Sequence, residues 1–330
     1  MRFAKFLLLC LGFYVLYYTV RQVGIGHITD SLSHLGWSFL PVLCVYPFIF
    51  AFDTTGWLYA FPRNLSRPVP WLDLYRIRII GETLNAVIPF SASLGGEPVK
   101  AEILKRRYGI PLSEGLASLL IVHTTFWLSL NLFVIGGILV TLKTMPLTPV
   151  LWKSVLAFLL GLGSIALLLI AGLHYGIFRK IHKLGEVFKW WKHDSEEKKL
   201  KFLALDGDIK KFYTQNKKHF FLSVFWNFLG WFTGTVEVWL VARMTGMPVD
   251  FTQAWLLEAL IQVLRIITFF IPSSIGVQEG GIVLIFSQLG FPPGPSLAFA
   301  LIRRVRELLW VGLGLTLWAT AKDKPQISQT

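Results

Sequence analysis

Long apolar segments, separated by short polar or basic connections, run through most of the chain. A helix needs about 20 mainly apolar residues to cross a bilayer. Segments of that length with few charged residues inside them are 35–60, 112–142, 150–178, 219–242 and 295–319. A weaker apolar run near the N-terminus is followed by Arg21 and Gln22 and lacks a small-residue cleavage site, so we expect a retained anchor. The pattern predicts an all-α membrane protein with about six to eight spans.

Two other segments, 72–108 and 252–292, are too broken for a plain span and too apolar for a soluble loop. In each, a helical pattern reaches a proline, which is followed by serines, glycine and a glutamate: Pro89 and Glu97 in the first segment, Pro272 and Glu279 in the second. Each glutamate begins another short helical stretch that ends at a glycine, with a proline two residues later. The chain therefore contains an internal repeat of roughly 50 residues.

The distribution of Lys and Arg predicts the topology. Residues 179–218 carry twelve of them and should be cytoplasmic. Counting spans from there places 61–78 and 100–107 on the cytoplasmic side and 243–251 outside, and leaves both termini inside. The two broken segments would then enter the bilayer from opposite faces as re-entrant helical hairpins.

This topology makes residues 1–320 a single domain with an inverted repeat. Half one covers about 72–142 and half two about 252–319, with the basic loop 179–218 between them and a short tail at 321–330.

Composition supports the membrane class and removes several others. Hydrophobic residues make up 54% of the 330 positions and charged residues 15%, whereas soluble domains carry roughly a quarter charged residues. The net charge of +13 fits cytoplasmic loops of a membrane protein, and we expect no nucleic-acid binding. Cys10 and Cys44 are isolated inside apolar runs, without metal-ligand spacing. We expect no metal and no cofactor.

Broken backbone inside a bilayer has a specific meaning. Unpaired backbone groups in lipid cost several kcal/mol, so non-helical chain survives there only if it is packed in protein or lines a wet cavity. Two breaks that meet near the midplane from opposite sides are typical of secondary transporters. The alternative is that the glycines and serines merely allow close helix packing and the prolines add kinks.

The two glutamates are the sharpest candidates for a binding site. An ionisable group inside a membrane is a functional candidate by default. Alternatively, Glu97 and Glu279 only cap the helices that they begin. Their expected partners lie in the following span, in the pairs Glu97–His123 and Glu279–Arg304, facing one cavity. His123 could instead bond a neighbouring helix.

Further candidates flank the two breaks. Glu82 and Asn85 lie three positions apart, so one helix face presents both of them. We predict that a polar substrate contacts these two residues together with Gly95, Gly96, Glu97, Lys100, His123, Ser274, Gly276, Gln278, Glu279 and Arg304. Glu258, Gln262 and Arg265 form a comparable polar stripe before the second break. Both groups could also serve only helix-to-helix hydrogen bonds.

The basic loop 179–218 contains apolar residues at helical spacing with lysines between them: Ile181, Leu184, Val187, Phe188 and Trp191. This pattern predicts an interfacial amphipathic helix that rests on anionic lipid. A solvated basic loop is the alternative.

The stretches GETLNAVIPFSASLGGEPVKAEIL and FFIPSSIGVQEGG resemble the integral-membrane, flippase-like domain of bacterial lysylphosphatidylglycerol synthases. The resemblance covers about residues 1–320. The family pattern falls on Gly81, Glu82, Asn85, Pro89, Gly95, Gly96 and Glu97, and on Pro272, Ser274, Gly276 and Glu279. It implies movement of a lipid between leaflets. The family often has arginine where His123 stands, and the soluble aminoacyl-transferring domain is absent, so no synthase activity is expected.

These patterns together predict a lipid translocase of the bacterial cytoplasmic membrane rather than an enzyme. Its substrate would be an anionic or aminoacylated phospholipid or a polyprenyl-linked molecule. A membrane-embedded enzyme acting on a lipid-linked substrate and a non-transporting accessory subunit are the alternatives, although no catalytic constellation supports the former.

Overall fold

The computed structural model describes residues 36–61, 68–88, 95–141, 149–174, 196–268 and 276–321, together with four single positions, Cys10, Tyr14, Tyr17 and Arg21. Throughout these ranges the regular structure is helical, and the predicted all-α class is confirmed. The expected N-terminal anchor, the helix at 181–191, Pro89, Pro272 and Ser274 lie outside the described residues.

Two groups of four helices make up most of the described chain. The first half contains α3 (Phe39–Ala60), α4 (Trp71–Val87), α5 (Glu97–Tyr108) and α6 (Leu112–Thr141). The second half contains α10 (Lys217–Met244), α11 (Phe251–Ile267), α12 (Val277–Gln288) and α13 (Pro293–Thr320). Between them lie α7 (Pro149–His174) and α9 (Glu196–Gln215), and the short helix η1 (Gly36–Ser38) precedes α3.

The two halves match helix by helix. Helices α4 and α11 both have 17 residues, α5 and α12 both have 12, and α6 and α13 have 30 and 28. Both short helices end before a left-handed glycine, Gly109 (φ 68°) or Gly290 (φ 84°), a conformation that disfavours any residue with a Cβ. Pro111 or Pro292 follows two residues later and begins the turn into the long helix. The internal repeat predicted from the sequence is therefore also a repeat of helices.

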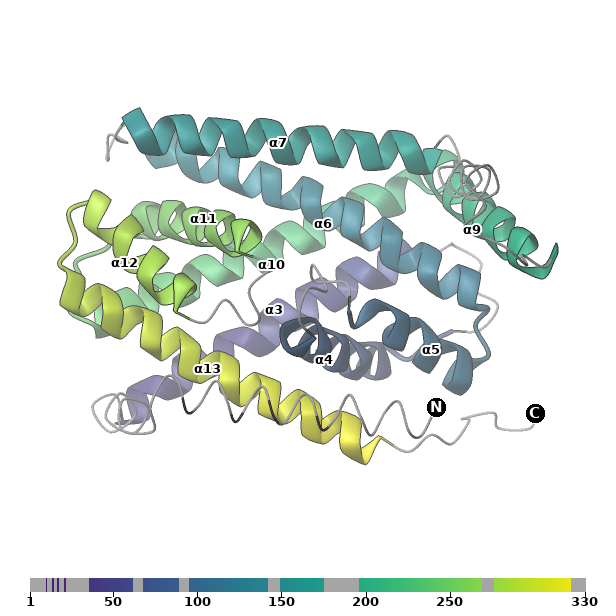
Figure 1. The fold of residues 1–330 in the computed structure, drawn as a ribbon, viewed down its shortest axis with the longest axis horizontal. Helices are drawn as coiled ribbons and strands as arrows, with labels where there is room; N and C mark the ends of the chain where they lie inside the picture. The colour runs from purple at the N-terminus through teal and green to yellow at the C-terminus, as the bar shows by residue number, and fades with distance from the viewer. Residues whose placement is uncertain are drawn as a thin grey trace.

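Packing follows the same correspondence. Helix α3 packs along α10, and the long helix of each half packs on the first hairpin helix of the other, α13 on α4 and α6 on α11. The α4–α5 pair and the α11–α12 pair lie toward opposite ends of the long helices (Figure 1). This placement fits hairpins that start from opposite sides.

Small residues allow the closest crossings. Gly56 of α3 lies against Asn227 of α10, and Gly230 of α10 lies against Asp53 of α3. Gly136 and Gly137 of α6 lie against the indole of Trp255. Close approach at small residues is the usual way in which helices associate inside a membrane.

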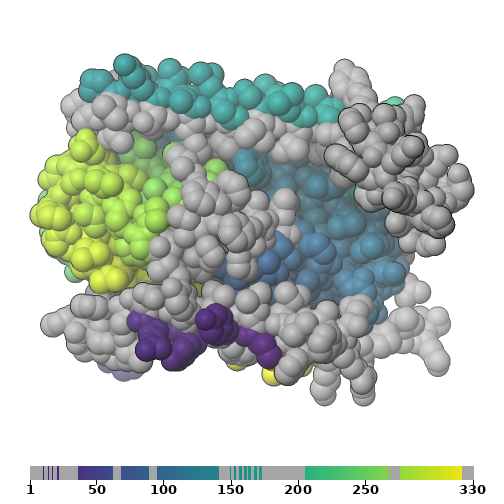
Figure 2. All heavy atoms as spheres, in the orientation of Figure 1, coloured from purple at the N-terminus to yellow at the C-terminus, as the bar shows by residue number. Residues whose placement is uncertain are grey.

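Two helices of the described chain, Gly36–Ala60 (η1 with α3) and Leu112–Val140 in α6, are long and apolar enough to cross a membrane. Helix α7 forms an outer edge of the molecule (Figure 2), and its Leu160, Leu167 and Leu168 are among the exposed apolar side chains. Exposed leucines on an outer helix suit contact with lipid tails.

Helix α9 was not anticipated inside the basic loop. Its Leu205, Ile209 and Phe212 are buried with residues of α5 and α6, such as Leu104 and Ile121. The many charged residues of α9 obscure its narrow apolar stripe, so the helix could not be predicted from the sequence pattern.

One prediction concerns the cap of α11. The Asp250 carboxylate accepts the backbone N–H of Gln253 at 2.8 Å, and the Gln253 side chain accepts the backbone N–H of Asp250 at 3.1 Å. Burial raises the pKa of Asp250, but hydrogen bonds from the Thr252 hydroxyl and from backbone N–H groups outweigh it and hold the pKa below its ordinary value. Asp250→Ala should lower the free energy of unfolding by about 1 kcal/mol at neutral pH.

The sign of the pH dependence follows from this lowered pKa. The carboxylate contribution is complete above the unfolded-state pKa of about 3.9 and is lost as the pH falls through the folded-state pKa. The thermal midpoints of Asp250→Ala and wild type should therefore converge in acid. Asp250→Asn, which keeps a capping oxygen, is the control, and an alanine variant as stable as wild type at pH 7 would contradict the assigned cap.

Candidate functional site

The first hairpin carries a buried cluster of charged residues. Lys100 Nζ lies 2.6 Å from Glu97 Oε1 and 3.3 Å from Glu82 Oε1, and the Lys100 side chain is 0% exposed. His123 Nε2 of α6 lies 3.3 Å from the same Glu97 oxygen. The predicted pair Glu97–His123 is therefore present, with Lys100 as an additional partner. A buried lysine is costly unless acids pair with it, and these two carboxylates do so.

Asn85 of α4 accepts a backbone hydrogen bond at the start of α5. Its Oδ1 accepts the backbone N–H of Gly96 at 2.7 Å, and its Nδ2 lies 3.4 Å from Glu97 Oε1. Glu97 is the acidic residue in the first turn of α5, and its Oε1 also lies within ion-pair distance of Lys100 and His123. Its charge is therefore placed to favour the start of α5 while it pairs with these basic side chains.

Glycines allow Lys100 and the hairpin to pack this closely. A Cβ at Gly81 would overlap the methylenes of Lys100, and a Cβ at Gly96 would overlap the carbonyl group of Gly81. The Lys100 ammonium also lies 5.6 Å from the ring of Trp57, which is fully buried. The two glycines thus let α4 and α5 meet backbone to backbone at the level of the acids.

Arg78 extends the cluster to α3. Its Nη2 lies 3.3 Å from Asp53 Oδ2, and its Nε lies 3.4 Å from Glu82 Oε1. The sequence analysis placed Arg78 in a cytoplasmic connection, and this was wrong: the residue is buried in the middle of α4. A count of Lys and Arg residues does not distinguish an arginine in a connection from an arginine in a helix. Here the helix begins seven residues before Arg78, at Trp71. Asp53 stands inside the apolar segment 35–60, where no local pattern indicates its partner.

The second hairpin is built differently around its own acid. Glu279 caps α12 by accepting the backbone N–H of Gly276 at 2.8 Å. It also accepts from Arg304 Nε of α13, so the predicted pair Glu279–Arg304 is present. Arg304 bonds Glu307 at 2.9 Å and Gln278 at 3.4 Å. Here capping and ion pairing coexist on one carboxylate.

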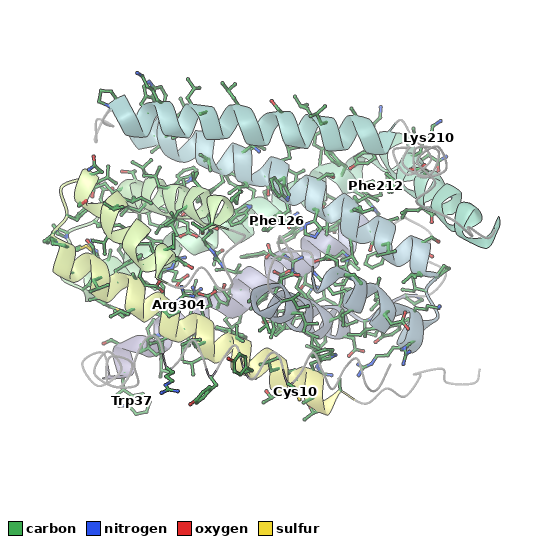
Figure 3. The ribbon with its side chains drawn as sticks, in the orientation of Figure 1. Cys10, Trp37, Phe126, Lys210, Phe212 and Arg304 are labelled. Atoms are coloured by element: carbon green, nitrogen blue, oxygen red, sulfur yellow. The ribbon has the colours of Figure 1, made fainter. Side chains whose placement is uncertain are left out.

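A third group of charges ties α13 to α10 and α11. Arg303 lies 2.9 Å from Glu258 and 3.5 Å from Glu237, and Arg306 lies 3.1 Å from Glu237. All four side chains are at most 4% exposed. Figure 3 shows the neighbouring Arg304 within the bundle, whereas Trp37 and Lys210 lie at its periphery. Glu237 stands inside the apolar segment 219–242, where no local pattern indicates that its partners lie on α13.

The partners on the long helices occupy equivalent positions. His123 lies eleven residues after Leu112, the first residue of α6, and Arg304 lies eleven residues after Pro293, the first residue of α13. Each contacts the acid at the start of its own short helix. Both halves thus present one acid and one basic partner in the same place.

Most of the predicted site residues fall into these clusters. Glu82, Asn85, Gly96, Glu97, Lys100 and His123 come together at the first hairpin, and Gly276, Gln278, Glu279 and Arg304 at the second. Gly95 lies in the turn that precedes α5. Their expected role in binding a substrate, and the single cavity that they would share, stay predictions.

Comparison with known families identifies the chain. The sequence profile described as "Lysylphosphatidylglycerol synthase TM region" matches residues 3–315, nearly the whole chain. The protein belongs to this family and is a membrane protein. No curated protein and no solved structure matches it significantly.

Proposed function

We propose that this protein moves a polar or charged phospholipid, or a lipid-linked molecule, between the leaflets of the bacterial cytoplasmic membrane, with both termini in the cytoplasm. The observation that carries the proposal is the matched pair of hairpins, each with an acid at the start of its short helix and a basic partner at the same position of the long helix. Inverted pairs of interrupted helices around a midplane site are the architecture of secondary transporters.

The chemistry of the two clusters suits a polar head group. Helix starts offer backbone N–H groups and partial positive charge, and the neighbouring acids and amides add specific contacts. Glu82 is 31% exposed and Glu307 is 16% exposed, so each cluster has one carboxylate near accessible space. Acyl chains would stay in the bilayer while the head group passes between these clusters. Rearrangement of one half against the other would alternate access.

The proposal predicts that loss of both acids stops transport. Purified protein in liposomes with a fluorescent phospholipid should expose inner-leaflet lipid to an added quencher. Glu97→Gln combined with Glu279→Gln keeps side-chain size and an oxygen acceptor but removes both charges. Exchange should fall at least about ten-fold, equivalent to about 1.4 kcal/mol of barrier height.

Glu102→Gln is the matched control, because Glu102 lies on α5 but pairs only with Arg106 in a partly exposed position. It should leave exchange unchanged. Exchange that is normal in the double variant would refute the proposed pathway. A new lipid product formed by wild type without exchange would instead identify an enzyme.

A further inference from the structure

The charges of the first hairpin do not balance. Among the described residues its cluster contains three carboxylates, from Asp53, Glu82 and Glu97, and two basic side chains that we count as cations, Arg78 and Lys100. The nine residues between α4 and α5, 88–96, read IPFSASLGG and supply no charge. With a neutral His123 the cluster therefore carries one net negative charge. A net charge buried in a membrane protein is costly, so one further positive charge is stabilising there.

The second hairpin has no such deficit. Among the described residues, the second hairpin and the adjoining third group together hold the acids Glu237, Glu258, Glu279 and Glu307 and the cations Arg265, Arg303, Arg304 and Arg306, so four charges of each sign are present. The stretch between α11 and α12 contains no charged residue either. The two halves thus differ by one charge, although their helices match.

The difference lies at one equivalent position. Where the second half has Arg304, which is always charged, the first half has His123. Histidine is the side chain that ordinarily gains or loses a proton near neutral pH. The missing positive charge of the first cluster can therefore be supplied by one proton on His123.

The geometry around Glu97 favours a proton at this place. Oε1 of Glu97 is shared by Lys100, His123 and Asn85, while its buried Oε2 has no hydrogen-bond partner among the described residues. His123 Nε2 lies within ion-pair distance of Oε1 but is not aligned for a hydrogen bond. The His123 side chain is 20% exposed, so it is the more accessible member of the pair.

The charged groups of the cluster beside His123 come, within the described part of the chain, from three helices. Helix α4 contributes Glu82, Arg78 and Asn85, helix α5 contributes Glu97 and Lys100, and helix α3 contributes Asp53. Beside His123, the uncharged Thr124 and Thr125 are bonded to Tyr213 of α9 and to Ser223 and Asn227 of α10. Helix α7 carries only Lys153 and His174, near its two ends, and the α11 contact on α6 centres on Trp255, beside Gly136 and Gly137.

We propose that the His123–Glu97 pair is a proton-binding site, and that lipid movement is coupled to the binding and release of this proton. The inference rests on the proposed function and adds to it an energy source and the residue that senses it. Proton binding neutralises the first cluster and makes it equivalent to the second. Release of the proton restores the net negative charge of the first cluster. This charge opposes closure of the first hairpin while no substrate is bound.

The proton site can be tested without any transport. Protein carrying ¹⁵N-labelled histidine in lipid nanodiscs is titrated by NMR over roughly pH 5 to 9, with His123→Gln to assign the signal. The His123 signal should titrate within this range, and Glu97→Gln should weaken proton binding by about ten-fold or more. His219→Gln is the control, because His219 packs against the Tyr59 ring away from the cluster and its loss should leave the His123 titration unchanged.

A His123 signal that does not titrate would overturn the proton site. A titration midpoint of His123 that is unaffected by Glu97→Gln would overturn it too, as would a titration that belongs to Asp53 instead. The coupling is tested by exchange in liposomes. His123→Arg should exchange lipid at one rate across the pH range, equal to the rate of wild type at its acidic end. Wild-type exchange that does not depend on pH would refute the coupling. No exchange in any preparation would refute the proposed function, while the NMR titration would still decide the proton site.

Discussion

Replacing Glu237 by alanine is expected to lower the free energy of unfolding by about 3–5 kcal/mol. Glu237 is fully buried on α10 and lies 3.1 Å from Arg306 and 3.5 Å from Arg303, both on α13. Without it, Arg306 keeps mainly its contact with the Tyr46 ring, 4.0 Å from the guanidinium carbon, and Arg303 keeps Glu258. The variant therefore leaves one buried positive charge without a compensating acid.

The measurement is unfolding of purified protein in detergent, followed by circular dichroism. Glu102→Ala is the matched control, since it removes an acid from a 2.7 Å ion pair with Arg106 whose side chains are 29% and 38% exposed. Its cost should be below about 1 kcal/mol. The double variant Glu237→Ala with Arg306→Ala should cost less than the sum of the single variants, because the unpaired charge is removed. Equal losses in Glu237→Ala and Glu102→Ala would show that the buried cluster does not hold α10 to α13.

Much of the fold could be predicted because the relevant signals are local. Apolar length gave the long helices, and α6 differs from its predicted segment, 112–142, by a single residue. The prolines, glycines and glutamates of the two broken segments gave the repeat, since each residue type has a direct effect on backbone geometry. The same segments gave both acid–base pairs, which occupy equal positions in equivalent helices.

The charged partners from other helices could not be predicted. Asp53 lies 25 residues before Arg78, and Glu237 lies 69 residues before Arg306. Such pairs depend on which helix faces join in three dimensions, and one chain carries no local signal for that choice. A charge inside a long apolar run, as at Asp53 and Glu237, is the nearest available indication, because it must find a partner.

Replacing Gly96 by alanine is expected to cost about 2–3 kcal/mol and to stop lipid exchange. Gly96 has ordinary right-handed helical angles, φ −82° and ψ −15°, so alanine is tolerated by the local backbone. The obstacle is the neighbouring helix, because the new Cβ would overlap the carbonyl group of Gly81, and backbone atoms cannot rotate away. Helix α5 must then move from α4, which separates Lys100 from Glu82 and breaks the hydrogen bond from Gly96 to Asn85.

Gly280→Ala separates this effect from a general effect of replacing glycine. Gly280 lies in α12, where a Cβ would meet no atom within 4 Å, so alanine should be neutral or should stabilise the protein by up to about 1 kcal/mol. Thermal midpoints and exchange rates of both variants are compared with wild type. The prediction requires a loss of stability at Gly96 and no loss of stability at Gly280. A Gly96→Ala protein as stable and as active as Gly280→Ala would mean that α4 and α5 are not in backbone contact at the acid of the first hairpin, and the geometry assigned to that cluster would be wrong.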